Sequence, residues 1–129
     1  EGIQSDGSYF QHGNLLCSAG SYGTVFVKGI ETFIVQLYGT CFALPDEKIE
    51  LFIDHLLDDQ SMFHRMYGTA YFSIGRSAVY ANGASQLMGT ARTLSRIDGI
   101  YRRDDLLRYS ESFSDITKTE KSKVRRSVL

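Results

Sequence analysis

The sequence predicts a mainly α-helical fold. Apolar residues recur at i, i+3 and i+4 over several long stretches, which is typical of helices with one buried face. The period-2 alternation that marks strands is scarce, and the chain contains a single proline. Broad apolar faces in so short a chain predict helical hairpins that form either a small bundle or part of a larger helical array.

Composition excludes several classes of protein. The chain has 129 residues, enough for one modest domain, with 43% hydrophobic and 22% charged residues. A net charge of −1 gives no field that attracts nucleic acid or a membrane surface, and no apolar run approaches the ~20 residues that span a bilayer. The basic run at 118–129 lacks aromatic residues for base stacking, so we expect a flexible basic tail over 117–129. We predict neither nucleic acid nor membrane as a partner.

The first helix is expected from about Ser21 to Tyr38. Gly39 is a plausible stop, because glycine adopts the left-handed conformation common at helix ends. The apolar face of this helix consists of Tyr22, Val25, Phe26, Ile30, Phe33, Ile34 and Leu37.

Three more helices are expected. Pro45 breaks the chain, Asp46 is a candidate cap for the second helix, and this helix should end near Asp59 or Met62. The glycine- and tyrosine-rich stretch 66–84 predicts a structured connection with one extended piece. The third helix is expected near 85–97, and a short fourth from about 103 to 113.

The histidines differ in their surroundings. His55 lies beside the apolar face of the second helix, which favours a packing or surface role, and His64 could interact with the C-terminus of that helix. His12 lies in the polar, glycine-flanked stretch "YFQHGN", where burial gives no reason for it. Tyr22 has two interpretations, a core residue of the first helix or a member of a site. Arg76 is likewise either a surface cation or a member of a site. No phosphate loop or metal-ligand cluster is present in the sequence pattern, so we expect no cofactor and no metal.

The order of several short motifs resembles the catalytic stretch of polysaccharide lyase family 8, the chondroitin, hyaluronan and xanthan lyases. These motifs are "DGSYFQHG" (6–13), "GSYGTVFVKGIE" (20–31), "GTCFAL" (39–44) and "GRSA" (75–78), and the resemblance covers roughly 1–80. It implies an α/α-toroid catalytic domain, of which 1–116 would be an incomplete part. It also implies further toroid helices and β-sandwich domains in a longer parent protein, secreted or periplasmic.

The resemblance implies cleavage of a uronic-acid-containing polysaccharide, of chondroitin or hyaluronan type, by β-elimination. Tyr22 matches the family's tyrosine general acid/base, His12 the histidine that assists it, and Arg76 an arginine close to the tyrosine. A phenol is a weak base at its ordinary pKa of about 10, so this chemistry requires a cation beside the phenolate. Gln11, Asn14 and Tyr80 are the expected substrate-binding residues.

The pattern departs from the family at the position of Tyr80, where a second arginine is normally found. Two alternatives to an active lyase therefore stay open. One is a catalytically inactive domain that binds acidic glycans, and the other is a structural helical domain in which Tyr22 is core and His12 is incidental. We expect the chain to be a processed product or a piece of a longer protein, since it begins at Glu1.

Overall fold

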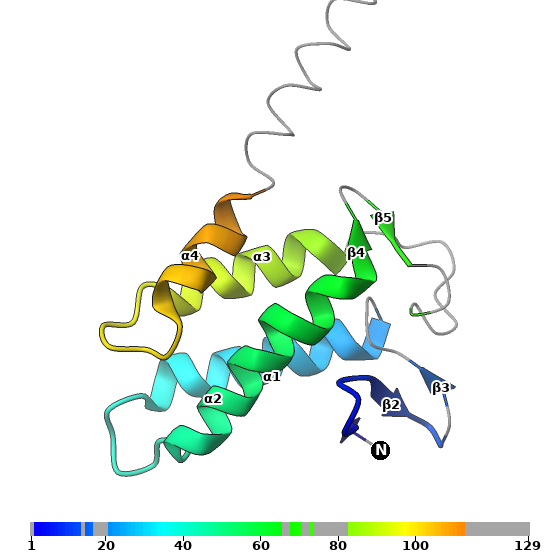
Figure 1. The fold of residues 1–129 in the computed structure, drawn as a ribbon. Helices are drawn as coiled ribbons and strands as arrows, with labels where there is room; N and C mark the ends of the chain where they lie inside the picture. Colours follow the sequence, from blue (N-terminus) through cyan, green and yellow to red (C-terminus); the bar gives the residue numbers. More distant parts are fainter. Residues whose placement is uncertain are drawn as a thin grey trace, which may run out of the picture.

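The structure is a computed structural model (Figure 1), which describes residues 2–13, 15–16, 21–65, 68–70, 73 and 83–112. Helices dominate the described residues, and the predicted mainly α class is confirmed. They are α1 (Ser21–Leu37), α2 (Asp46–Asp54), the π-helical turn η1 (His55–Asp59), the 3-10 turn η2 (Gln60–Phe63), α3 (Gly83–Leu94) and α4 (Arg103–Glu111). α2, η1 and η2 follow one another without a break and form one long helical segment.

The helix boundaries agree with the predictions to within two or three residues. α1 ends one residue before the predicted Tyr38, and Gly39 adopts φ +75° just beyond it, as a helix-terminating glycine does. α3 begins and ends somewhat earlier than expected. The prediction that Asp46 caps the second helix is wrong. Pro45 occupies the capping position and its carbonyl accepts the first helical bonds, while Asp46 lies inside the first turn.

Strands that the sequence analysis did not expect lie in the opening segment. β1 (Gly2–Ile3), β2 (Tyr9–Gln11) and β3 (Leu15–Leu16) form an antiparallel sheet in the order β1-β2-β3. A second antiparallel pair, β4 (His64–Arg65) and β5 (Gly68–Thr69), follows η2. In Figure 1 both small sheets lie at one end of the helices, and the loop between α1 and α2 lies at the other.

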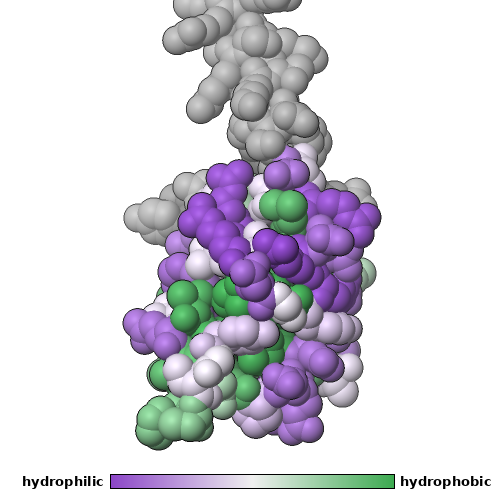
Figure 2. Space-filling model, turned by 90° about the vertical axis from the view of Figure 1, so that its left-hand side faces the viewer, coloured by the Kyte–Doolittle hydropathy of each residue, from purple (hydrophilic) through white to green (hydrophobic). Residues whose placement is uncertain are grey.

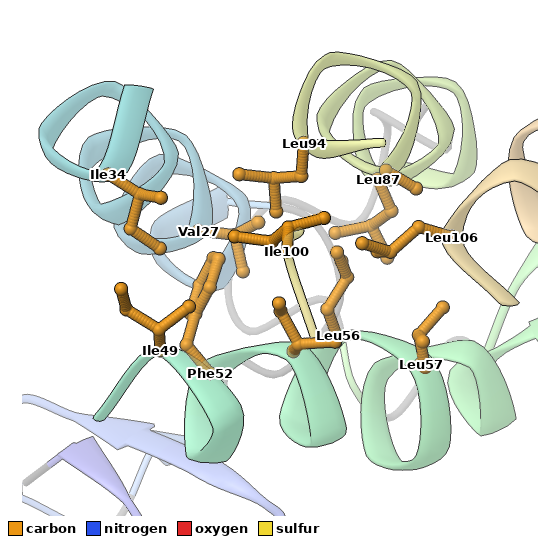
Figure 3. Packing of buried hydrophobic residues seen from close by; sticks show 12 residues of the cluster. Val27, Ile34, Ile49, Phe52, Leu56, Leu57, Leu87, Leu94, Ile100 and Leu106 are labelled. Carbon is orange, nitrogen blue, oxygen red and sulfur yellow. The ribbon is translucent and has the colours of Figure 1, made fainter. Parts of the chain in front are cut away.

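The core lies between the long α2–η1 segment and the pair α1 and α3 (Figure 3). Side chains from all of these elements, together with Ile100 and Leu106, point into one cluster. Leu56, Leu87, Leu94 and Leu106 are completely buried. Burial of each such leucine contributes roughly 1.5–3 kcal/mol, so this cluster fixes the helices that carry the site.

A buried carboxylate joins α1 to α3. Glu31 is only 3% exposed, and it accepts a hydrogen bond of 2.5 Å from the hydroxyl of Thr90 on α3. Lys28, one turn earlier on α1, forms an ion pair with the same carboxylate. A buried charge is costly unless it is paired, and here both oxygens have partners.

One face of the molecule divides into a polar and an apolar part (Figure 2). Hydrophilic side chains cover its upper part, at the level of α3 and α4, and apolar side chains gather below. Phe42 in the loop between α1 and α2 is 77% exposed, and Cys41 beside it is an exposed free thiol. Among the described residues, no helix has the length and apolarity that crossing a bilayer requires.

Candidate functional site

The turn between β1 and β2 explains the first half of the motif "DGSYFQHG". Asp6 accepts hydrogen bonds from both the amide and the hydroxyl of Ser8, at 3.0 and 2.6 Å. These bonds, the hydroxyl first, lower the pKa of the Asp6 carboxyl. Gly7 adopts φ +77° between them, a conformation that side chains rarely adopt. Asp6, Gly7 and Ser8 therefore build a tight turn.

Strand β2 holds the second half of the motif against α1. The ring of Tyr9 stacks on that of Phe26, with centroids 4.9 Å apart and planes at 27°. The hydroxyl of Tyr9 donates to Oε1 of Gln11 at 3.2 Å. Gln11, predicted to bind substrate, thus lies half-buried at the end of β2. These contacts fix the strand that leads to His12.

The structure brings His12 and Tyr22 together. His12 follows β2 directly, and Tyr22 lies in the first turn of α1. Their ring centroids are 4.9 Å apart and their planes meet at 76°, an edge-to-face contact. His12 adopts φ +54° and the next residue, Gly13, φ +81°. A left-handed histidine is uncommon and marks a position that the surrounding structure holds in place.

The other predicted site residues lie outside the described residues. They are Asn14, Arg76 and Tyr80, and the predicted tail 117–129 also falls there. Their assignments remain predictions. Among the described residues, no group of three or more histidine, cysteine, aspartate or glutamate side chains is placed to hold a metal ion.

A buried network next to the N-terminal hairpin, which consists of β1, β2 and the turn at Gly7, was not predicted from the sequence. His55 is 1% exposed and Gln60 is fully buried. Nδ1 of His55 lies 3.1 Å from Oδ2 of Asp59, and its Nε2 lies 3.0 Å from the amide nitrogen of Gln60. Because the amide nitrogen can only donate, Nε2 accepts and Nδ1 carries the proton that Asp59 receives. Burial lowers the pKa of His55 and favours this neutral form, although Asp59 opposes the shift. The expected packing role of His55 is confirmed.

His64 has a different role from the one considered. It begins β4 in an extended conformation and is 6% exposed. Burial lowers its pKa to about 4, so the imidazole is neutral near pH 7. His64 does contact the end of the preceding helical segment, but through its backbone N–H, which donates to the carbonyl of Ser61, and its neutral imidazole brings no positive charge there.

A groove lined mainly by polar and charged residues lies between α3 and α4. It has a volume of about 390 Å³ and is lined by Arg92, Ser95, Arg96, Arg103, Asp104 and Leu107. Nε of Arg103 donates to the carbonyl of Ser95 at 2.8 Å, which joins the two helices. Three arginines and one aspartate line this groove, and the excess of positive charge suits an anionic ligand.

The chain belongs to polysaccharide lyase family 8, because residues 1–95 match the N-terminal α-helical domain of that family. The structure is similar to that of a chondroitinase AC lyase, whose active site was revealed by enzyme–oligosaccharide complexes and mutagenesis. The TM-score is 0.73 at 23% sequence identity, and the match covers 88% of this chain and 17% of that one. No curated protein matches the chain. The family assignment confirms the predicted resemblance, and the structural match confirms the predicted helical fold.

Proposed function

We propose that the protein containing this chain is a lyase that cleaves a uronic-acid-containing polysaccharide of chondroitin or hyaluronan type by β-elimination. Tyr22 is the general acid/base, and His12 and Arg76 assist it. The remaining helices of the catalytic domain and β-sandwich domains belong to the parent protein, which acts outside the cytoplasm on an acidic glycan.

The contact between His12 and Tyr22 is the observation that carries this proposal. A histidine on a strained turn and a tyrosine at a helix start lie with ring centroids 4.9 Å apart, and both side chains belong to a loop and a helix fixed by separate contacts. Groups that share one substrate must converge in this way. The structural alternative, in which Tyr22 is core and His12 is incidental, gives no reason for a left-handed histidine beside Tyr22.

The elimination balances with these groups alone. The phenolate of Tyr22 removes the C5 proton of the uronic acid, and the electrons of that C–H bond form the C4–C5 double bond. The C4–O bond breaks, and the leaving oxygen takes the proton from the Tyr22 hydroxyl, which restores the phenolate. His12 and Arg76 neutralise the substrate carboxylate and the phenolate, and Gln11, Asn14 and Tyr80 orient the sugar.

Tyr22→Phe in the full-length protein tests the assignment. It removes the proton carrier and keeps the ring, so we expect the rate of formation of the unsaturated uronate product to fall by about 10²–10⁴-fold. The ultraviolet absorbance of this product measures the rate. Phe33→Tyr, which adds a hydroxyl on the exposed side of the same helix, serves as the control. Full activity of Tyr22→Phe with chondroitin and hyaluronan would contradict the role of Tyr22.

The arginine groove between α3 and α4 favours a second candidate, binding of an acidic glycan without cleavage. In that case the full-length protein binds chondroitin sulfate in calorimetry and yields no product. Arg92→Glu with Arg96→Glu weakens this binding, whereas Tyr22→Phe leaves it unchanged. Cleavage by the wild-type protein that Tyr22→Phe abolishes would reject this candidate.

A further inference from the structure

The carboxylate of Asp59 packs directly on the backbone of Gly7. Gly7 is buried in the turn between β1 and β2, and a Cβ added to it would overlap the Asp59 carboxylate. Gly7 therefore serves two requirements, the φ of +77° and the close approach of a side chain from η1. This contact joins the turn of the N-terminal hairpin to the long helical segment, which lie near one another in Figure 1.

The position of Asp59 is itself fixed by buried groups. The backbone N–H of Gln60 donates to the carbonyl of His55, five residues earlier, as a π-helical turn requires. The wider turn brings both Asp59 and Gln60 to the ring of His55, which binds one with each nitrogen. Because the ring is almost completely buried, neither partner can move without leaving a buried polar atom unpaired. The Asp59 carboxylate, although 34% exposed, is thus held in place by the buried ring of His55.

The N-terminal hairpin connects the Gly7 turn, which contacts Asp59, to His12 in the candidate site. The chain runs from Gly7 through buried Ser8 and Tyr9, the latter stacked on Phe26, to the turn that carries His12. His12 meets Tyr22 at the far end of this short stretch. A shift of the turn at Gly7 would therefore move His12 relative to Tyr22.

We propose that Asp59, oriented by His55 and Gln60, is a positioning residue that fixes the Gly7 turn and thereby sets His12 against Tyr22. This inference rests on the proposed lyase function for its consequence in catalysis. Asp59 does not touch the substrate and acts only through the hairpin.

The test uses the full-length protein and two readouts. Gly7→Ala introduces a methyl group into the Asp59 carboxylate, and we expect kcat for product formation to fall by about 10²-fold while KM changes far less. Hydrogen exchange of residues 2–13, followed by mass spectrometry, should become faster. Gly39→Ala is the matched control, because Gly39 has nearly the same φ (+75°) and open space around it. It should leave both readouts unchanged.

Substitution of Asp59 separates positioning from general destabilisation. Asp59→Ala should reproduce the loss of kcat and the faster exchange, whereas Asp59→Asn keeps an acceptor for His55 and should restore both. The double variant Gly7→Ala, Asp59→Ala should lose less activity than the product of the two single losses, since the group that the methyl meets has been removed and only the strain at φ +77° is added.

Unchanged exchange of 2–13 in Gly7→Ala would overturn the inference, as would losses in the double variant that simply multiply. The exchange readout needs no catalysis. If the wild-type protein cleaves no acidic glycan, the proposed function fails, and the exchange of 2–13 still decides whether Asp59 fixes the hairpin.

Discussion

The long helical segment α2–η1 is held to its neighbours in two different ways on two sides. On the hairpin side, Asp59 packs on Gly7 and accepts a hydrogen bond from the buried ring of His55. On the α4 side, Asp54 and Asp58 bind Arg102, which also bonds Asp105 at the start of α4. The carboxylates of Asp58 and Asp59 are adjacent in sequence, yet one forms a solvent-accessible ion pair and the other supports a buried neutral network.

The difference teaches how each side responds to its surroundings. Arg102 is 26% exposed and Asp58 is 57% exposed, so salt screens their attraction. The hydrogen bonds that Arg102 donates to Asp58, Asp54 and Asp105 raise its pKa and keep it charged. Arg102 in turn lowers the pKa of Asp105. On the hairpin side the Asp59 carboxylate is 34% exposed, but its partner His55 is buried and neutral, so salt has no ion pair to screen there. We therefore expect salt to weaken the α4 side and acid to weaken the hairpin side.

The largest expected effect is on the hairpin side. His55→Ala removes a fully buried ring and leaves the Gln60 amide without its acceptor, so the free energy of unfolding should fall by roughly 2–4 kcal/mol. Urea denaturation measures it. Asp58→Ala, on the α4 side, should cost less than about 1 kcal/mol. Equal losses for the two variants would remove the distinction between the sides.

The second largest effect is expected from acid, which should lower the free energy of unfolding because the buried imidazoles resist protonation. The pKa of His64 is about 4 in the folded chain and about 6.5 when unfolded, so between these values the unfolded state binds more protons. Stability is complete above about pH 6.5 and decreases as the pH falls toward 4, by about 2 kcal/mol between pH 8 and pH 5 for His64 alone. The lowered pKa of His55 acts in the same direction.

Urea denaturation at several pH values measures this slope, and His64→Leu should flatten it. A slope that His64→Leu leaves unchanged would contradict a neutral buried imidazole at that position.

The smallest effect is expected from Arg102→Gln. The loss of its ion pairs should reduce the free energy of unfolding by about 0.5–1 kcal/mol at low ionic strength. At ~1 M salt, where the Debye length is about 3 Å, the variant and the wild type should become equal. Thermal unfolding at the two salt concentrations compares them. A difference that persists in high salt would show that Arg102 acts by packing rather than by charge.

The helices could be predicted because each has a long apolar face with a 3.6-residue period, as in α1 and α2. The strands β1 to β3 have two or three residues each, too short for a period of two to be visible. The π-helical turn was equally hidden. The spacing of an ordinary helix is kept by the buried residues Phe52, Ile53, Leu56 and Leu57. The wider turn becomes evident only from the backbone hydrogen bond between Gln60 and His55.

The candidate site could be predicted in part for a related reason. His12 and Tyr22 lie only ten positions apart in the sequence, so a short connection brings them together. The contact of Gly7 with Asp59 joins residues distant in the sequence, and no local pattern indicates it. Glycine in "DGS" indicates a tight turn, but the carboxylate that approaches it comes from another element.

The π-helical turn also makes the function of η1 depend on a count of residues. A π-helical turn holds one residue more than an α turn, so deleting one residue within η1 would close the turn to ordinary α geometry while the backbone N–H of Gln60 keeps its bond to the His55 carbonyl. If the deleted residue lay between His55 and Asp59, Asp59 would follow His55 by three residues in place of four, and its carboxylate would shift relative to the His55 ring and Gly7. The link between the N-terminal hairpin and the helices therefore depends on the number of residues in η1 as well as on its side chains.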